Sequence, residues 1–291
     1  MSEIGNKISK ADIDLIDESL DRSQSVSYNI FIQIESGRLS FCVYNTALNK
    51  YIVLRSYPLF ANDSSQFAAI CRSIFENDDL LGLKYKNSAC LWVSSRYTLV
   101  PAHLFLPEEA DTYLTFSHGK ADDEQVLHCN SQTANLQHVF SCPAELITLV
   151  RTCQPFVRFF HQSAPFIESA VACMPATNKV DVAIFFYGHW LDILVMKNNR
   201  LLFYNSFQIN APADSLYYLL GVTNLFDTVL LSTKITYAGT LKPMPPEIAI
   251  LKGYVDSITE CEPSNAVAYS NYITEPFRKK FVHLFNLLRC E

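Results

Sequence analysis

The sequence predicts an α/β fold that is built twice in succession. A stretch rich in aromatic and β-branched residues at 28–60 returns in similar form at 180–211. Turn-forming residues, among them Gly37 and Gly188, divide each stretch into three short apolar runs, which is typical of hairpin strands. Helical patterns and further apolar runs follow each stretch. The later strands are therefore expected to be parallel and to complete a mixed sheet that helices cover.

The two stretches contain strands at matching places. In the first stretch the expected strands are 29–34, 39–44 and 51–57. In the second stretch they are 181–186, 191–196 and 200–207. Only a few turn residues join neighbouring runs, so each set of three is expected to form an antiparallel meander.

Each half then continues with helix, strand, helix, strand and helix. In the first half Asp63 or Ser64 can cap the first helix, and the later elements are expected at 89–95, 143–153, 155–160 and 164–173. In the second half Asp214 is the expected cap, and the later elements are expected at 227–233, 245–252, 254–260 and 273–289.

This order divides the chain into a polar leader at 1–27, a first lobe at 28–178 and a second lobe at 179–291. Apolar residues between Ile13 and Leu20 of the leader fit either an extra edge strand or a short helix. The first lobe also carries an insertion at 96–141. Its expected strands are 97–105, 124–129 and 134–140, and an acidic segment at 106–111 interrupts them.

Composition excludes several classes of protein. Hydrophobic residues make up 49% of the 291 residues and charged residues 18%, which favours a sizeable core over disorder. The net charge of −6 argues against nucleic acid as a partner, since the longest basic run is Arg278–Lys280, which fits the solvated face of a helix. The nine cysteines contain no C-x-x-C pair and mostly lie in apolar runs, as expected of core residues in a reducing compartment. The polar start and the absence of long apolar runs predict a cytoplasmic protein without membrane contact.

Three antiparallel strands followed by helix, strand, helix, strand and helix, present twice, resemble the actin-like ATPase superfamily, which is built on the ribonuclease H-like fold. In length and strand pattern the chain is similar to an uncharacterised bacterial family with a diverged, duplicated actin-like fold. The resemblance covers nearly the whole chain from Tyr28 onward. It implies two lobes, each with a mixed five-stranded sheet flanked by helices.

In members of the superfamily that hydrolyse ATP, the turn between the first two strands of each half binds phosphate through an Asp, a Gly and small or hydroxyl residues. In the first turn of this chain Glu35 and Gly37 fall near the Asp and the Gly. Arg38 and Leu39, however, stand where small residues are expected.

The second turn keeps Gly188, but Phe186 replaces the acid and His189–Trp190 occupy the turn itself. The superfamily's Gly-Gly adenosine loop is expected near 232–240, where this chain has only Gly239. Bulky side chains at these places block the approach of backbone amides to a phosphate. The resemblance therefore implies a fold whose phosphate loops are degenerate.

The sequence also contains residues that could form other kinds of site. A ribonuclease H-like nuclease needs carboxylates that converge on two metal ions, and the candidates are Glu35, Asp181, Asp192 and Asp227. A metal site could be imitated in the insertion by His128, Cys129, His138 and Cys142, although zinc ligands usually come in close pairs. Adjacent aromatic residues are mostly expected in the core, with any surplus forming an exposed patch for a partner; the pairs are Phe159–Phe160 and Tyr217–Tyr218.

The sequence assigns no catalytic, cofactor-binding or metal-binding residue. The leading hypothesis is a non-catalytic binding or scaffold protein, a pseudo-ATPase, whose inter-lobe cleft or 96–141 insertion serves a protein partner or self-association. The alternative is a nucleotide-binding protein or ATPase with an atypical inter-lobe site that uses Glu35 and Gly37 with ATP and magnesium. A third class is a small-molecule sensor with an aromatic-lined cleft.

Overall fold

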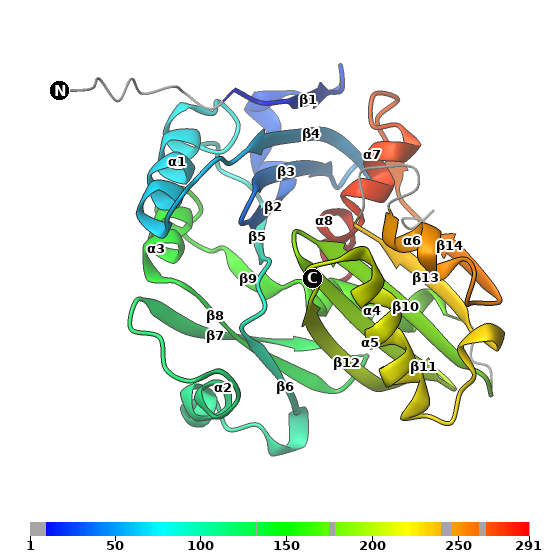
Figure 1. Ribbon diagram of the computed structural model, residues 1–291. Coiled ribbons are helices and arrows are strands. Elements are labelled where there is room, and N and C mark those ends of the chain that lie inside the picture. Colours follow the sequence, from blue (N-terminus) through cyan, green and yellow to red (C-terminus); the bar gives the residue numbers. More distant parts are fainter. Residues whose placement is uncertain (1–9, 132, 175–177, 240–245, 262–265, 291) are drawn as a thin grey trace. The chain divides into compact units, whose positions relative to one another are not determined.

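The computed structural model describes residues 10–131, 133–174, 178–239, 246–261 and 266–290, which form two compact units (Figure 1). The first unit contains the described residues up to Asn130, residues Leu136–Gln162 and the described part of Asn265–Thr274. The second contains the described part of Ser131–Asn135, of Ser163–Ser264 and of Glu275–Glu291. Each unit is built around its own mixed sheet.

The sheet of the first unit has the predicted core. Its antiparallel meander consists of β2 (Tyr28–Glu35), β3 (Arg38–Asn45) and β4 (Lys50–Pro58). β5 (Asn87–Trp92) pairs in parallel with β2, and β9 (Arg158–His161) pairs in parallel with β5. The resulting order, β4-β3-β2-β5-β9, confirms the expected five strands.

Two further strands cover the outer edge of β4. The leader forms β1 (Ile13–Ile16), antiparallel to β4, which decides between the edge strand and the short helix. A second segment, β15 (Ala268–Tyr269), pairs in parallel with the start of β4. With both edges paired, every residue of β4 between its two ends is buried.

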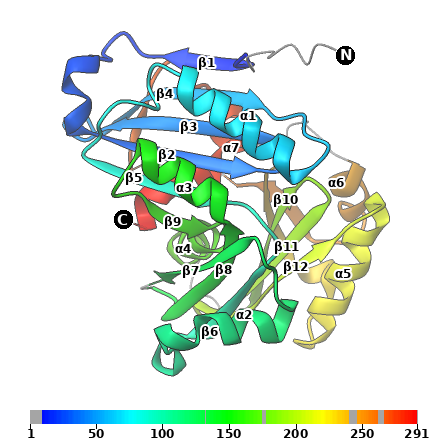
Figure 2. The same cartoon turned by 90° about the vertical axis from the view of Figure 1, so that its left-hand side faces the viewer.

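Two helices lie on one face of this sheet, where Figure 2 shows them next to each other. They are α1 (Ser64–Asn77) and α3 (Ala144–Cys153). Asp63 caps α1 as predicted, since its carboxylate accepts from the backbone N–H of Gln66 at 2.8 Å. The helix buries the face that carries Cys71, Ile74 and Phe75.

The 96–141 insertion forms a separate three-stranded sheet in the order β6-β8-β7. Its strands are β6 (Tyr97–Pro101), β7 (Glu124–Ser131) and β8 (Leu136–Pro143). The prediction was incomplete here, because β6 ends at Pro101 and the segment after it forms two short 3-10 helices and α2 (Ala110–His118). A proline lacks the N–H that a strand needs, and Pro107 instead begins the second 3-10 helix.

The second unit repeats the same sheet order, β12-β11-β10-β13-β14. The meander is β10 (Val180–Tyr187), β11 (Trp190–Lys197) and β12 (Arg200–Gln208), and the parallel strands are β13 (Lys234–Ala238) and β14 (Ser257–Glu260). Helices of this unit are α4 (Ser163–Cys173), α5 (Pro212–Asn224), α6 (Pro246–Leu251), α7 (Glu275–Lys280) and α8 (Val282–Asn286).

Three expectations for the second unit were wrong. The fourth strand is not 227–233, which contains a 3-10 helix at Leu230–Ser232, but begins at Lys234. The hydroxyls of Ser232 and Thr233 both donate to the Val229 carbonyl, and such local bonds compete with strand pairing. Asp214 lies inside α5, where it accepts from the N–H groups of Asn210 and Ala211. The expected 273–289 helix is broken at Phe281 into α7 and α8.

The internal repeat extends to single residues. The β3–β4 pairing shifts register between Val43 and Tyr44, and the β11–β12 pairing shifts at the corresponding place, between Val195 and Met196. A polar contact also recurs across these strands. The Ser40 and Ser56 hydroxyls lie 2.7 Å apart, and in the second copy the Ser206 hydroxyl donates to Asp192 at 2.5 Å.

Within the described residues, no helix is long and apolar enough to cross a membrane.

Candidate functional site

The first hairpin turn, where the superfamily binds phosphate, is closed by backbone pairing. Glu35 pairs directly with Arg38, so only Ser36 and Gly37 remain in the turn. The Gly37 carbonyl accepts from the backbone N–H of Leu59 at 2.9 Å, just past the end of β4. The turn is therefore only two residues long, and the chain that follows β4 is bonded to it.

Arg38, the cation that directly follows this turn, is already bound. Its guanidinium donates to both carboxylate oxygens of Asp12, at 2.8 and 2.9 Å, and to the Ser56 hydroxyl at 2.7 Å. Two parallel bonds to one carboxylate are the strong form of such a pair. Glu35, the predicted counterpart of the catalytic acid, accepts from the Gln33 amide at 3.3 Å. Asp12 of the leader thus neutralises the positive charge of Arg38, which a phosphate would otherwise require.

The second hairpin turn has the same construction. Tyr187 pairs with Trp190, which leaves Gly188 and His189 as the turn. Gly188 has a φ of 53°, a value that suits glycine. The His189 carbonyl accepts from the N–H of Ile209 at 2.8 Å, so the residue after the third strand closes the turn in both copies.

The expected adenosine loop is largely strand β13, because this strand occupies Lys234–Ala238. Gly239 follows it with a φ of 88°, and a Cβ there would lie only 2.2 Å from the Phe186 carbonyl oxygen. The glycine therefore allows its backbone to pack directly on β10. Thr240, the last residue of the expected loop, lies outside the described residues.

Phe185 of β10, which also lies against Gly239, belongs to an aromatic cluster. The Phe185 ring lies 3.9 Å from His283 of α8 and 6.1 Å from Phe166 of α4, measured between ring centroids. His283 is 3% exposed, and burial lowers its pKa to about 3. This face of the sheet is therefore a packed core.

The four carboxylates considered for a nuclease do not form a group. Asp181 and Asp192 lie on the paired strands β10 and β11, but Asp192 is opposite Phe185, four residues along β10 from Asp181. At about 3.3 Å per residue this separates them by about 13 Å. Asp192 is buried and accepts from the Tyr204 and Ser206 hydroxyls, whereas Asp227 is exposed after α5.

The histidines and cysteines of the insertion also lie apart. His128 is exposed, whereas its neighbour Cys129 is buried on the opposite face of β7. His138 is fully buried in β8, where burial lowers its pKa to about 3. In the described ranges no three His, Cys, Asp or Glu side chains are grouped as metal ligands would be.

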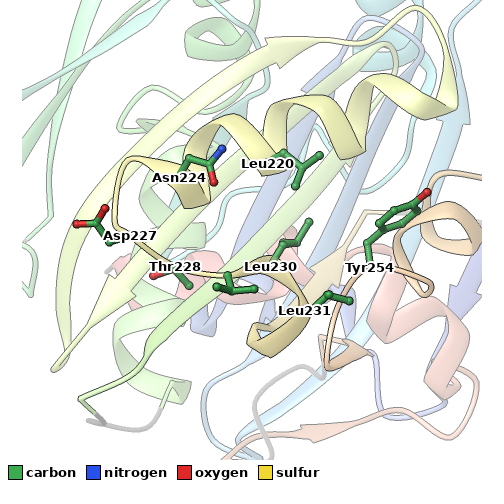
Figure 3. Close-up of a pocket in the computed structure, with 8 residues that line it drawn as sticks. Leu220, Asn224, Asp227, Thr228, Leu230, Leu231 and Tyr254 are labelled. Carbon is green, nitrogen blue, oxygen red and sulfur yellow. The ribbon is translucent and has the colours of Figure 1, made fainter.

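Surface apolar residues, by contrast, gather beside α5. A cavity of about 470 Å³ lies between this helix, the segment after it and Tyr254 (Figure 3). Its apolar lining is strongly exposed: Val229 and Leu231 at 64% each, Tyr254 at 48% and Leu220 at 40%. Leu230 forms the buried floor, and the polar lining residues are Asn224, Asp227 and Thr228. Such a surface can bind apolar side chains of another protein.

The sequence did not indicate this cavity. Val229 and Leu231 fall in the expected strand 227–233, which is not a strand in the structure. The residues that could have indicated an irregular segment are Asp227, Ser232 and Thr233, which favour turns. Asp227 adopts a φ of 49°.

The adjacent aromatic pairs differ in exposure. Phe159 and Phe160 are buried, Tyr218 stacks on Phe207 at 4.5 Å, and Tyr217 is 72% exposed.

Comparison with known proteins supports the fold. A structure from Bacteroides thetaiotaomicron, described as a protein with an actin-like ATPase fold and unknown function, superposes with a TM-score of 0.80. It is 23% identical, and the alignment covers 94% of this chain and 99% of that one. The PilM–PilN type IV pilus biogenesis complex superposes with a TM-score of 0.56 at 12% identity, over 92% of this chain and 99% of that chain.

The chain therefore has an actin-like ATPase fold, with two mixed sheets flanked by helices. No curated protein is significantly similar to it in sequence. A family model described as protein of unknown function DUF3822 matches residues 17–258, most of the chain. The chain belongs to the DUF3822 family.

Proposed function

We propose that this protein is a non-catalytic binding or scaffold protein, a pseudo-ATPase that keeps the actin-like fold without nucleotide turnover. The observation that carries the proposal concerns the two hairpin turns at which the superfamily binds phosphate, because both turns are closed by hydrogen bonds. Each has two residues, and each has a carbonyl bound by the N–H that follows the third strand, from Leu59 or Ile209. In addition, Asp12 neutralises Arg38 in the first turn.

The apolar cavity beside α5 supports a role in binding. Its exposed leucine, valine and tyrosine side chains suit a protein partner better than a phosphate compound, which would require cations or converging amides. The PilM–PilN structure is a complex of a protein with this fold, and it lends the idea a precedent at the level of the fold. We place the protein in the cytoplasm, since its eight described cysteines are free thiols.

The decisive experiment is a thermal-shift titration with ATP and ADP, with and without Mg²⁺. A specific ligand at about 100 times its Kd adds about 2.7 kcal/mol of stability. We expect no saturable shift with either nucleotide. A saturable, Mg²⁺-dependent shift that Glu35→Ala abolishes would overturn the proposal in favour of an atypical nucleotide site.

The binding role has its own test. Affinity capture from a native lysate is compared for the parent chain, Leu231→Asp in the cavity and Leu48→Asp in the β3–β4 turn. Both leucines are exposed, so neither change should unfold the protein. Loss of the same bound protein with Leu231→Asp alone is expected, and equal capture by all three chains would assign the partner to another surface.

A further inference from the structure

The outer edge of β12 is the second notable surface of this unit. β12 is the end strand of its sheet, and no strand of the described ranges pairs with its outer side. The strand is nine residues long, with Arg200 as its only charged residue and no proline. Proteins usually protect such an edge with charges, prolines or a covering segment, because an open edge can pair with another chain.

The internal repeat shows what covers the corresponding edge of the first unit. There β1 pairs with β4 in antiparallel orientation, and the Ser56 and Ile52 carbonyls accept from the N–H groups of Asp12 and Asp17. Ser206 corresponds to Ser56, and Leu202 corresponds to Ile52. Ile52 is 0% exposed under its covering strand, whereas Leu202 is 42% exposed. By analogy with β4, a β-strand is therefore the partner expected at the outer edge of β12.

We propose that β12 pairs with β12 of a second copy of this chain, in antiparallel orientation and centred on Asn205. The sequence around Asn205 is nearly symmetric, since Phe203 and Phe207 lie two residues to either side. A two-fold axis at Asn205 places Phe203 of one copy opposite Phe207 of the other. A two-fold interface of this kind uses the same patch on both chains.

The backbone pattern fits this register. Carbonyls of Ile52 and Ser56 reach the outer edge of β4, and outward groups alternate along a strand, so Leu202, Tyr204 and Ser206 direct theirs outward in β12. The two-fold at Asn205 makes Tyr204 and Ser206 a hydrogen-bonded pair. Asn205 with its own copy, and Phe203 with Phe207, become non-hydrogen-bonded pairs, in which side chains approach most closely.

The side chains are compatible with this pairing as well. Phe203 and Phe207 stack at 6.4 Å, and Tyr218 of α5 stacks on Phe207, so the pairing would extend an existing aromatic row. Arg200 would lie opposite Asn210, which brings no like charges together. In the single chain the Asn205 side chain accepts from the Ser206 N–H at 2.9 Å and must release it, which favours a weak dimer.

The first test is sedimentation velocity of the full chain across a wide range of concentration. We expect the average mass to rise towards a dimer. Leu202→Lys places a charge at the paired edge in both copies and should weaken dimerisation about tenfold, because a charge opposes cross-strand pairing. Leu48→Lys, at an exposed leucine of the first unit, is the matched control and should leave the dimer unchanged.

The second test reads the register by oxidation to disulfides. Non-hydrogen-bonded pairs bring Cα atoms to about 4.5 Å, within the range that a disulfide bridges. Asn205→Cys should therefore cross-link to itself above the background of the parent chain. Leu202 and Gln208 form a hydrogen-bonded pair in this register, with Cα atoms about 5.5 Å apart, which a disulfide also spans. Leu202→Cys should therefore not cross-link alone, but should do so when mixed with Gln208→Cys.

Three outcomes would overturn the proposal: a monomer at every concentration, a dimer insensitive to Leu202→Lys, or cross-linking that does not follow this pattern. A strictly monomeric chain would assign the edge to a strand of a different protein. The proposed β12 pairing does not depend on the two hairpin turns. Sedimentation and the nucleotide titration therefore test separate proposals, and either proposal can be overturned without the other.

Discussion

At the scale of single residues, one buried arginine organises the edge of the first unit. Arg55 donates to Asp14 of β1 at 2.8 Å and to Asp78 and Asp79 after α1 at 2.9 and 2.7 Å. The Asp78 side chain is 0% exposed, and it also accepts from the Tyr57 hydroxyl at 2.5 Å. These bonds join the leader strand, the sheet and the end of a helix.

Removal of this arginine should be costly. Arg55→Ala leaves the Asp78 carboxylate buried without its cation, and breaking a buried pair in this way typically costs about 3–5 kcal/mol. We expect a loss of this size in the free energy of unfolding of the first unit. Urea denaturation can follow the fluorescence of Trp92, the only tryptophan of that unit, in a Trp190→Phe background.

Arg72→Ala is the matched control. Arg72 bonds Glu145 at 2.6 Å, but both side chains are about half exposed, and exposed pairs contribute about 1 kcal/mol or less. Equal effects of the two substitutions would contradict the importance given to the buried network.

At the scale of secondary-structure elements, the sequence predicted strands well where aromatic and β-branched runs were separated by turn residues. All six meander strands were located to within about two residues, the known uncertainty of element ends. It failed at 227–233, where an apolar run was read as a strand although Asp227, Ser232 and Thr233 can form local bonds instead. The helix in the insertion was missed for a similar reason, because the acidic residues before α2 were read only as an interruption.

The end of β13 gives a prediction at this scale. Gly239→Ala should destabilise the second unit by at least about 2 kcal/mol, because a positive φ disfavours alanine and the added Cβ would collide with the Phe186 carbonyl. Trp190 fluorescence in a Trp92→Phe background measures this unit alone.

Gly221→Ala makes the same chemical change inside α5, where nothing lies within 4 Å of the added Cβ. It should stabilise the helix by up to about 1 kcal/mol. If both alanines shifted stability in the same direction, the close contact at Gly239 would not have the role assigned to it.

At the scale of the whole molecule, the sequence located the two hairpin turns that correspond to the phosphate-binding turns of the superfamily, but could not show that they are closed. The sequence shows that Arg38 and Trp190 occupy these positions. It does not show the bonds that Asp12 accepts or those that the Leu59 and Ile209 N–H groups donate, because these bonds depend on how distant segments fold together. The cavity beside α5 was hidden for the same reason. Its residues come from a helix, an irregular segment and Tyr254, and their exposure is a property of the folded chain.

Both units are expected to lose stability in acid. His138 and His161 in the first unit and His283 in the second are buried, and burial lowers the pKa of each to about 3, from 6.5. Between these values the unfolded chain binds protons that the folded chain does not. Stability is therefore fully present above pH 6.5 and is lost as the pH falls towards 3, by up to about 1.4 kcal/mol per pH unit for each histidine.

Urea denaturation at a series of pH values between 6.5 and 4.5 tests this dependence above the range in which most carboxylates titrate. In a Trp92→Phe background, where Trp190 reports the second unit, His283→Leu should flatten the slope by up to about 1.4 kcal/mol per pH unit, because the imidazole that gains a proton on unfolding is gone. His189→Leu, at an exposed position of the same unit, should keep the parent slope. A slope that His283→Leu leaves unchanged would show that other groups cause the acid sensitivity of this unit.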